Sequence, residues 1–151
     1  DDQFVIKART DAAGPIGLTE AIDRLKLYVE AGADVLFADA LMSEEDIAAV
    51  AGSVPKPLSV NMGLGLLTRG TTPLIHPKRL QEMGVAMISY PRLMSTGAVR
   101  GMMNAMDALT DMIAGDEPVE RPDLLVPFKD LNALVGIGFL DELEDRYAGT
   151  E

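Results

Sequence analysis

Polar side chains follow four short apolar runs of this sequence, and their types suit the recognition of a carboxylate. In chain order the run ends carry Arg9 with Asp11, Asp39, Asn61, and Ser89 with Tyr90. The planar guanidinium of an arginine grips a carboxylate through two parallel hydrogen bonds, and an aspartate can take or return a proton. Aspartate and asparagine also cap ordinary turns, so each residue alone is weak evidence. Four polar run ends together favour one shared site.

The elements that must position these side chains are four strands. The apolar runs cover residues 4–6, 35–38, 58–60 and 85–89. They are continuous rather than alternating, which is typical of parallel strands buried on both faces beneath helices. Because the active sites of such folds lie at the carboxyl ends of the strands, we expect the polar run ends to meet at one edge of the sheet.

Helix signals separate the runs. Thr19 is expected to cap a first helix that Gly32 ends, and Ser43, followed by three acidic residues, to cap a second helix. Pro77 suits the first position of a third helix, which Gly84 stops. The order of elements is therefore strand then helix, repeated, which indicates an α/β fold with right-handed crossovers.

A long helix and a tail complete the pattern. An apolar stripe that includes Met102 and Met106 predicts the longest helix at about residues 96–114. Methionines make an adaptable apolar face, suited to a core or to a contact between subunits. We expect residues 1–115 to form four strand–helix units and residues 116–151 to form an acidic, proline-flanked linker and a helical tail.

Four strand–helix units are compatible with two architectures. They can form an open, doubly wound sheet, or half of a closed (β/α)₈ barrel, which needs eight units and about 250 residues. Residue 1 is Asp rather than Met and the first run begins within a few residues, so we expect a piece of a longer or processed chain. The missing half of a barrel would come from that longer chain or from a second one.

Composition excludes several classes of function. The 151 residues are 48% hydrophobic, which is enough for a core, and 13 basic against 24 acidic residues give a net charge of −11. That charge argues against nucleic acid and anionic membranes as partners. The absence of cysteine excludes a disulfide framework and fits a reducing compartment, so we expect a cytoplasmic protein. No apolar run approaches the ~18 residues of a spanning helix.

Several stretches resemble the second half of the barrel of the isocitrate lyase/phosphoenolpyruvate mutase superfamily. They are FVIKARTDA, GLTEAIDRLKLYVEAGADVLFADAL, PLSVNMG and TTPLIHPKRLQEMGVAMISYP, in order through residues 4 to about 113. The tail, RPDLLVPFKDLNALVGIGFLDELEDRYA, resembles the C-terminal segment of members close to 2-methylisocitrate lyase, carboxyphosphonate mutase and oxaloacetate decarboxylase.

The resemblance implies a fold, a reaction class and a cofactor. The chain would hold strands five to eight of a TIM (β/α)₈ barrel, followed by a C-terminal helical tail. The superfamily uses Mg²⁺ to break or make C–C or P–C bonds beside a carboxylate in small 2-oxo or hydroxy acids, through an enolate-like intermediate. The magnesium-binding aspartates and the loop with the cysteine general acid lie in the first half of that barrel, so no metal ligand is expected within this chain.

The resemblance also assigns roles to individual residues. Arg9 matches the arginine that holds a substrate carboxylate, with Asp11 as its brace or a turn cap. Asp39 stands where members mostly carry a glutamate of the acid/base network, one methylene shorter, so that a water would have to fill the gap. Asn61 and Thr72 match substrate-binding positions. We therefore expect Arg9 and Asp39 to be catalytic, and Arg9, Asn61 and Thr72 to bind substrate.

Other positions are weaker candidates. Arg69 is an additional cation near the expected site, and an exposed loop position explains it better. His76 precedes Pro77, so a helix N-terminus is a better explanation than general-base catalysis. Tyr90 is placed equally well for packing or for the site.

Two classes of function follow from the resemblance. The first is a Mg²⁺-dependent carbon–carbon lyase acting on a small carboxylic acid, with mutase or hydrolase chemistry as a variant. The second is a truncated, non-catalytic half-barrel that serves as a binding or assembly module. In this superfamily the last barrel helix is exchanged between paired subunits, so we expect a homo-oligomer in which the helix at residues 96–114 is exchanged.

Overall fold

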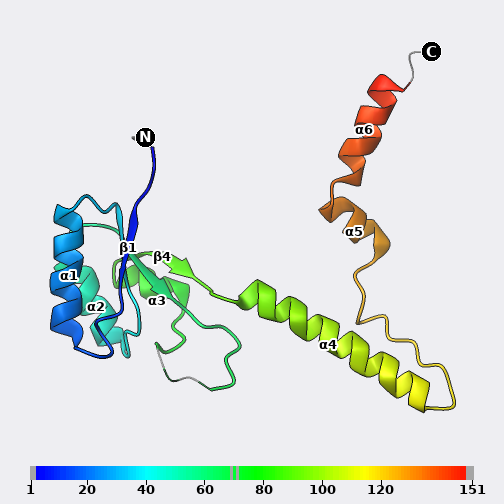
Figure 1. Cartoon of the computed structure of the whole chain (residues 1–151), viewed down its shortest axis with the longest axis horizontal. Helices are drawn as coiled ribbons and strands as arrows, with labels where there is room; N and C mark the ends of the chain where they lie inside the picture. The colour runs from blue at the N-terminus through cyan, green and yellow to red at the C-terminus, as the bar shows by residue number, and fades with distance from the viewer. Residues whose placement is uncertain (1–2, 69, 71, 149–151) are drawn as a thin grey trace. The chain divides into compact units, whose positions relative to one another are not determined.

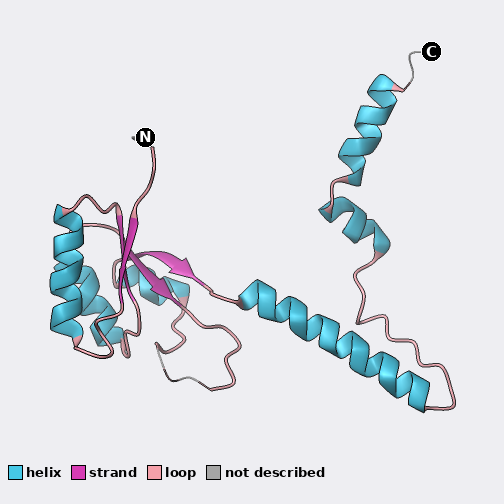
Figure 2. Ribbon diagram, viewed as in Figure 1, coloured by secondary structure: helices cyan, strands magenta, loops and turns pink. Residues whose placement is uncertain are grey.

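The structure is a computed structural model that describes residues 3–68, 70 and 72–148. Strands and helices alternate through most of it (Figure 2). In chain order the elements are β1 Lys7–Thr10, α1 Leu18–Glu30, β2 Val35–Ala38, α2 Glu44–Ser53, β3 Leu58–Asn61, α3 Pro77–Glu82, β4 Val85–Ser89, α4 Leu93–Ala114, α5 Phe128–Leu134 and α6 Ile137–Tyr147. Residues 1–95 and 96–151 form two separate compact units.

The first unit is built on a sheet of four parallel strands in the order β1-β2-β3-β4. Each strand therefore pairs with the next strand along the chain. A doubly wound sheet reverses its strand order at a switch point and carries helices on both faces. The sequential order excludes that alternative for the described residues.

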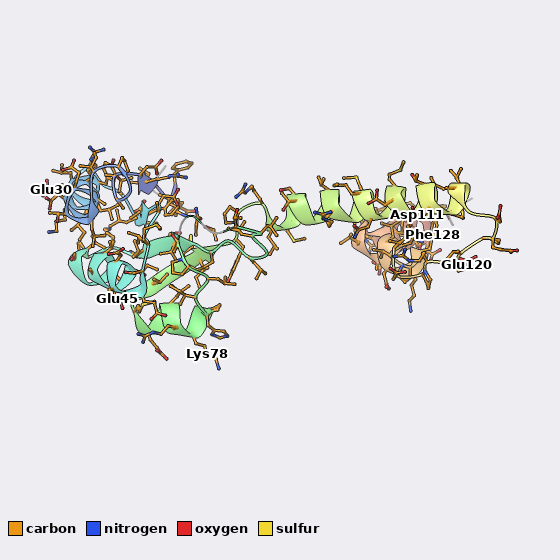
Figure 3. All side chains as sticks on the ribbon, turned by 90° about the horizontal axis from the view of Figure 1, so that it is seen from below. Glu30, Glu45, Lys78, Asp111, Glu120 and Phe128 are labelled. Atoms are coloured by element: carbon orange, nitrogen blue, oxygen red, sulfur yellow. The ribbon has the colours of Figure 1, made fainter. Side chains whose placement is uncertain are left out.

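The core lies between the sheet and the helices α1, α2 and α3, which cover one face of the sheet (Figure 1). Each helix contributes fully buried side chains to it, namely Leu25 from α1, Ile47 and Val50 from α2, and Leu80 from α3. The sheet contributes alternate residues such as Leu36, Leu58 and Val60. Charged residues Glu30, Glu45 and Lys78 lie on the outer side of the helices (Figure 3).

The helix ends match the sequence signals with one exception. The Ser43 side chain accepts a hydrogen bond from the Asp46 N–H at 3.1 Å, as expected of an N-cap. Pro77 opens α3, and Gly84 follows its end with φ 89°, a left-handed conformation that favours glycine. The prediction for Thr19 was wrong, because α1 already begins at Leu18.

The first strand lies further along the chain than its apolar run indicated. Residues 4–6 are not in the strand, and Phe4 is 75% exposed. The ladder begins at Lys7, which pairs with Val35, and the Ile6 carbonyl accepts the N–H groups of Asp34 and Val35 at the start of β2. As an edge strand, β1 turns Ala8 and the 3%-exposed Thr10 toward the core and leaves its other face open. Alternate residues of β1 therefore face the core, and Ala8 is the single apolar residue of the strand.

The second unit is helical and contains most of α4, together with α5 and α6. The long helix α4 begins at Leu93, three residues before the predicted start, and the tail forms α5 and α6. No residue described in α4, α5 or α6 is buried. The predicted division at residue 115 stays a prediction. Within the described part of the chain, no helix combines the length and apolarity needed to cross a membrane.

Candidate functional site

Arg9 is the centre of a polar cluster at the carboxyl end of the sheet. Its Nε donates to Asp11 Oδ1 at 2.5 Å, and its Nη2 donates to Asp11 Oδ2 at 3.2 Å. The same Nη2 donates to Asp39 Oδ2 at 2.7 Å, which ties β1 to the residue that follows β2. The Arg9 side chain is 48% exposed.

Hydrogen bonds continue from this cluster across the ends of the next two strands. Asn61 Nδ2 donates to Asp39 Oδ1 at 3.5 Å, and the Ser89 hydroxyl donates to Asn61 Oδ1. These hydrogen bonds therefore connect Arg9 to Ser89 through Asp39 and Asn61. The expectation that the polar run ends meet at one edge is confirmed, while their roles stay predictions.

The charges of the cluster stabilise one another. The hydrogen bond that Arg9 donates to Asp11 is the largest cause that raises the pKa of Arg9 above its ordinary value, and the charge of Asp39 acts in the same direction. The hydrogen bond from Arg9 in turn lowers the pKa of Asp11. The Arg9 guanidinium carbon also lies 5.1 Å from the centre of the Phe37 ring, within range of a cation–π contact. One cation and two carboxylates leave this cluster with a net charge of −1 while all three are ionised.

A cavity of about 190 Å³ adjoins the cluster. It is lined by Asp39, Asn61, Gly63, Leu66, Thr72, Pro91 and Arg92. Thr72, predicted to bind substrate, is 7% exposed and lies in this wall. The structure therefore brings Thr72 to the same place as Asp39 and Asn61.

Sequence reasoning missed Arg92. It follows Tyr90 and Pro91 after the end of β4 at Ser89, so a cation three residues after a strand end was the available signal. Its backbone has φ 65°, and Ala40, which follows Asp39, has φ 58°. Non-glycine residues seldom adopt this region, and such residues cluster at functional sites.

The weaker candidates lie elsewhere. His76 Nδ1 accepts the Lys78 N–H at 3.2 Å at the start of α3, which confirms the helix N-terminus prediction. His76 and Tyr90 line a different, largely apolar cavity of about 430 Å³ together with Leu64, Leu74, Ile75, Pro77 and Leu93. Arg69 lies outside the described residues.

The described residues do not fit a magnesium site by themselves. Mg²⁺ prefers carboxylate and water oxygens in octahedral geometry. The nearby carboxylates of Asp11 and Asp39 both accept hydrogen bonds from Arg9. No cluster of three or more histidine, aspartate or glutamate side chains able to hold a metal occurs among residues 3–68, 70 and 72–148.

Comparison with known proteins places this geometry in a family context. The model of the phosphoenolpyruvate phosphomutase family matches residues 1–110. The chain is 32% identical to 2,3-dimethylmalate lyase of Eubacterium barkeri over 145 residues, which are 96% of this chain and 48% of that protein. It is 30% identical to the chloroplastic carboxyvinyl-carboxyphosphonate phosphorylmutase of Arabidopsis thaliana over 151 residues, covering 98% of this chain and 42% of that one.

A solved structure gives the same result. The structure of oxaloacetate acetylhydrolase in complex with the inhibitor 3,3-difluorooxalacetate superposes with a TM-score of 0.81 and 28% identity, over 97% of this chain and 47% of that one. The chain thus spans about half the length of the proteins it matches. Their names cover a lyase, a mutase and a hydrolase.

Proposed function

The chain belongs to the phosphoenolpyruvate phosphomutase family of the isocitrate lyase/phosphoenolpyruvate mutase superfamily, and we propose that it forms part of a carbon–carbon lyase. The substrate is a small 2-oxo or hydroxy (di)carboxylic acid, cleaved at the bond next to a carboxylate. The observation that supports this most directly is the Arg9 cluster, in which a half-exposed guanidinium stands beside a carboxylate and a cavity. The relatives that are lyases favour the same reaction class.

Arg9 binds a substrate carboxylate in this proposal. Its bonds to Asp11 and Asp39 use Nε and Nη2. An incoming carboxylate approaches from the Nη1 side, while Asp11 holds the guanidinium in place. A guanidinium braced in this way loses less side-chain entropy when it binds a ligand. Asn61 and Thr72 add hydrogen bonds to the same ligand from the cavity wall.

Asp39 is the acid/base group. In a hydroxy acid it takes the proton of the hydroxyl group, the C–O bond becomes a carbonyl, and the C–C electron pair moves to the carbon beside the carboxylate. The enolate-like product then takes a proton at that carbon. Positive charge and hydrogen-bond donors near the developing negative charge lower the barrier to this step. The Arg9 guanidinium, 2.7 Å from Asp39, supplies part of that charge.

The four strand–helix units are the second half of a (β/α)₈ barrel in this proposal. Helices cover one face of the sheet. On the other face the Arg9 side chain is 48% exposed and Met87 is 45% exposed. In a barrel that face points inward and is covered by the remaining strands. Those strands, contributed by residues outside this chain or by a second chain, also bring the ligands for Mg²⁺.

The barrel assembles as a homo-oligomer in which α4 is exchanged between subunits, in the cytoplasm. The apolar stripe of α4 supports an intersubunit contact, since Met102 and Met106 are 61% and 60% exposed. Exposed apolar stripes of this kind mark interaction surfaces. Sedimentation of the purified chain tests this part of the proposal. We expect Met102→Glu with Met106→Glu to shift an oligomer to monomer, and a wild type that sediments at 16.1 kDa contradicts it.

Turnover tests the reaction itself. The complete barrel, formed by this chain together with the strands outside it, is offered 2-oxo and hydroxy dicarboxylates with Mg²⁺, and cleavage products are followed by NMR. We expect turnover that Arg9→Ala abolishes and that the control Arg121→Ala, a change in the second unit, leaves intact. Turnover that survives Arg9→Ala contradicts the assignment of Arg9. Carboxylate binding without turnover favours the alternative, a non-catalytic half-barrel, and phosphonate products favour mutase chemistry.

A further inference from the structure

We propose that Arg92 binds the second carboxylate of a dicarboxylic acid in the 190 Å³ cavity, opposite the carboxylate bound by Arg9. This inference rests on the proposed function and narrows its substrate class to dicarboxylates. It assigns to Arg92 the selection of substrate rather than a part in bond cleavage. The observations behind it are the position of Arg92 in the cavity wall, the charge balance of the site, and the backbone conformation of Arg92.

The position of Arg92 matches a ligand with two acidic ends. Arg92 lines the cavity together with Asp39 and Asn61, and Asp39 is the residue that bonds to Arg9. A molecule in this cavity therefore lies beside Arg92, and Asp39 joins the cavity wall to the guanidinium of Arg9. At about 190 Å³ the cavity is smaller than typical pockets for drug-sized ligands, of about 300–1,000 Å³, which restricts its occupant to a small acid.

The charge balance among the side chains of this chain also favours a second cation beside the cluster. Arg9, Asp11 and Asp39 together carry a net charge of −1, which repels an anion. Adding Arg92 brings the group to two positive and two negative charges, so one carboxylate no longer meets net repulsion. Arginine suits this task because its planar donors match the two oxygens of a carboxylate.

The backbone of Arg92 indicates that its side chain is retained against a steric cost. A non-glycine residue at φ 65° is disfavoured, whereas glycine adopts the same conformation freely. The preceding Pro91 fixes the chain before this turn, and α4 begins directly after it at Leu93. Glycine would be the default residue for such a turn, so the presence of an arginine here points to a function of the side chain.

Binding of two matched ligands tests the inference. Malate and lactate share the hydroxy acid group and differ in the second carboxylate, and their dissociation constants are measured by calorimetry or NMR. For the wild type we expect malate to bind at least tenfold more tightly than lactate, the factor expected for one charge-assisted contact. In Arg92→Met the two affinities should become equal, through loss of malate affinity only. Arg24→Met, a change on α1, serves as the control and should leave both affinities unchanged.

Arg92→Gly separates the side chain from its backbone conformation. It should raise the unfolding temperature, because glycine relieves the strain at φ 65°, and still abolish the preference for malate. A wild type that binds neither acid overturns the proposed function together with this inference. A wild type that prefers malate, and keeps the preference in Arg92→Met and Arg92→Gly, overturns the role of Arg92 alone.

Discussion

The chain contains two Arg-x-Asp pairs with nearly the same local geometry, one in each unit. Arg9 contacts Asp11 through Nε and Nη2, and Arg121 contacts Asp123 through the same two nitrogens, at 2.9 and 2.8 Å. The two arginines are almost equally exposed, at 48% and 47% of the side chain. In both pairs the hydrogen bond raises the pKa of the arginine and lowers that of the aspartate.

The surroundings of the two pairs differ. Arg9 also bonds to Asp39 at the end of the neighbouring strand, and the adjoining cavity contains the amide of Asn61 and the cation Arg92. Arg121 lines a cavity of about 240 Å³ together with Asp111 and Glu117. Counting Asp123, three carboxylates face one guanidinium there, so an anion is repelled. The Arg-x-Asp motif therefore fixes the local ion pair, whereas the surrounding residues determine whether the arginine can bind an anion.

The largest expected difference is in carboxylate binding. Arg9→Met should weaken both malate and lactate binding by about ten- to a hundredfold, because a charge-assisted contact is lost with either ligand. Arg121→Met should change neither affinity by more than about twofold, within the scatter of surface substitutions. Calorimetric titration measures both variants. Equal losses of affinity in the two variants would contradict this expectation, because they would show that the position of Arg9 at a strand end does not contribute to carboxylate binding.

A smaller effect is expected from Asp39, the second carboxylate that contacts Arg9. Asp39→Asn should tighten malate binding by about threefold, because it removes one negative charge beside the anion and leaves the Asp11 brace in place. Asp111→Asn is the matched change next to Arg121, and we expect no effect on malate. Weaker binding in Asp39→Asn would identify Asp39 as a support that Arg9 needs for binding.

The smallest effect is in the titration of the two paired aspartates. The pKa values of Asp11 and Asp123 both lie below the ordinary value of 3.8. Each ion pair therefore stabilises the fold above pH 3.8, and its contribution is lost as the pH falls through the lowered pKa. NMR titration of the carboxyl carbons should place both midpoints below 3.8. In Arg9→Met only the midpoint of Asp11 should return toward that value.

Elements with a strong local signal could be predicted from the sequence. The cap at Ser43 and the start of α3 at Pro77 depend on side-chain and backbone chemistry within one turn, and both were confirmed. The apolar run at residues 4–6 predicts a strand there, whereas the structure has β1 at Lys7–Thr10. The strand β1 has one open face, and Ala8 is the single apolar residue of its ladder at Lys7–Thr10.

The candidate site could be predicted only in part. Arg9, Asp39 and Asn61 end neighbouring strands, and parallel pairing brings such ends together whatever the details of the loops. Arg92 depends on a left-handed turn after β4, which no residue type in that stretch signals. Arg9 and Arg121 illustrate the same point, because the sequence shows both Arg-x-Asp motifs and does not show which charges the fold brings near them.

The sequential order of the sheet has a consequence for biosynthesis. Each strand pairs with the one made just before it, and each crossover brings its own helix to the same core. Local pairing of this kind keeps loop-closure entropy small. We therefore expect β1, α1 and β2 to fold together while the later strands are still being synthesised. The Arg9–Asp39 contact would then form before the cavity beside Asp39 is complete.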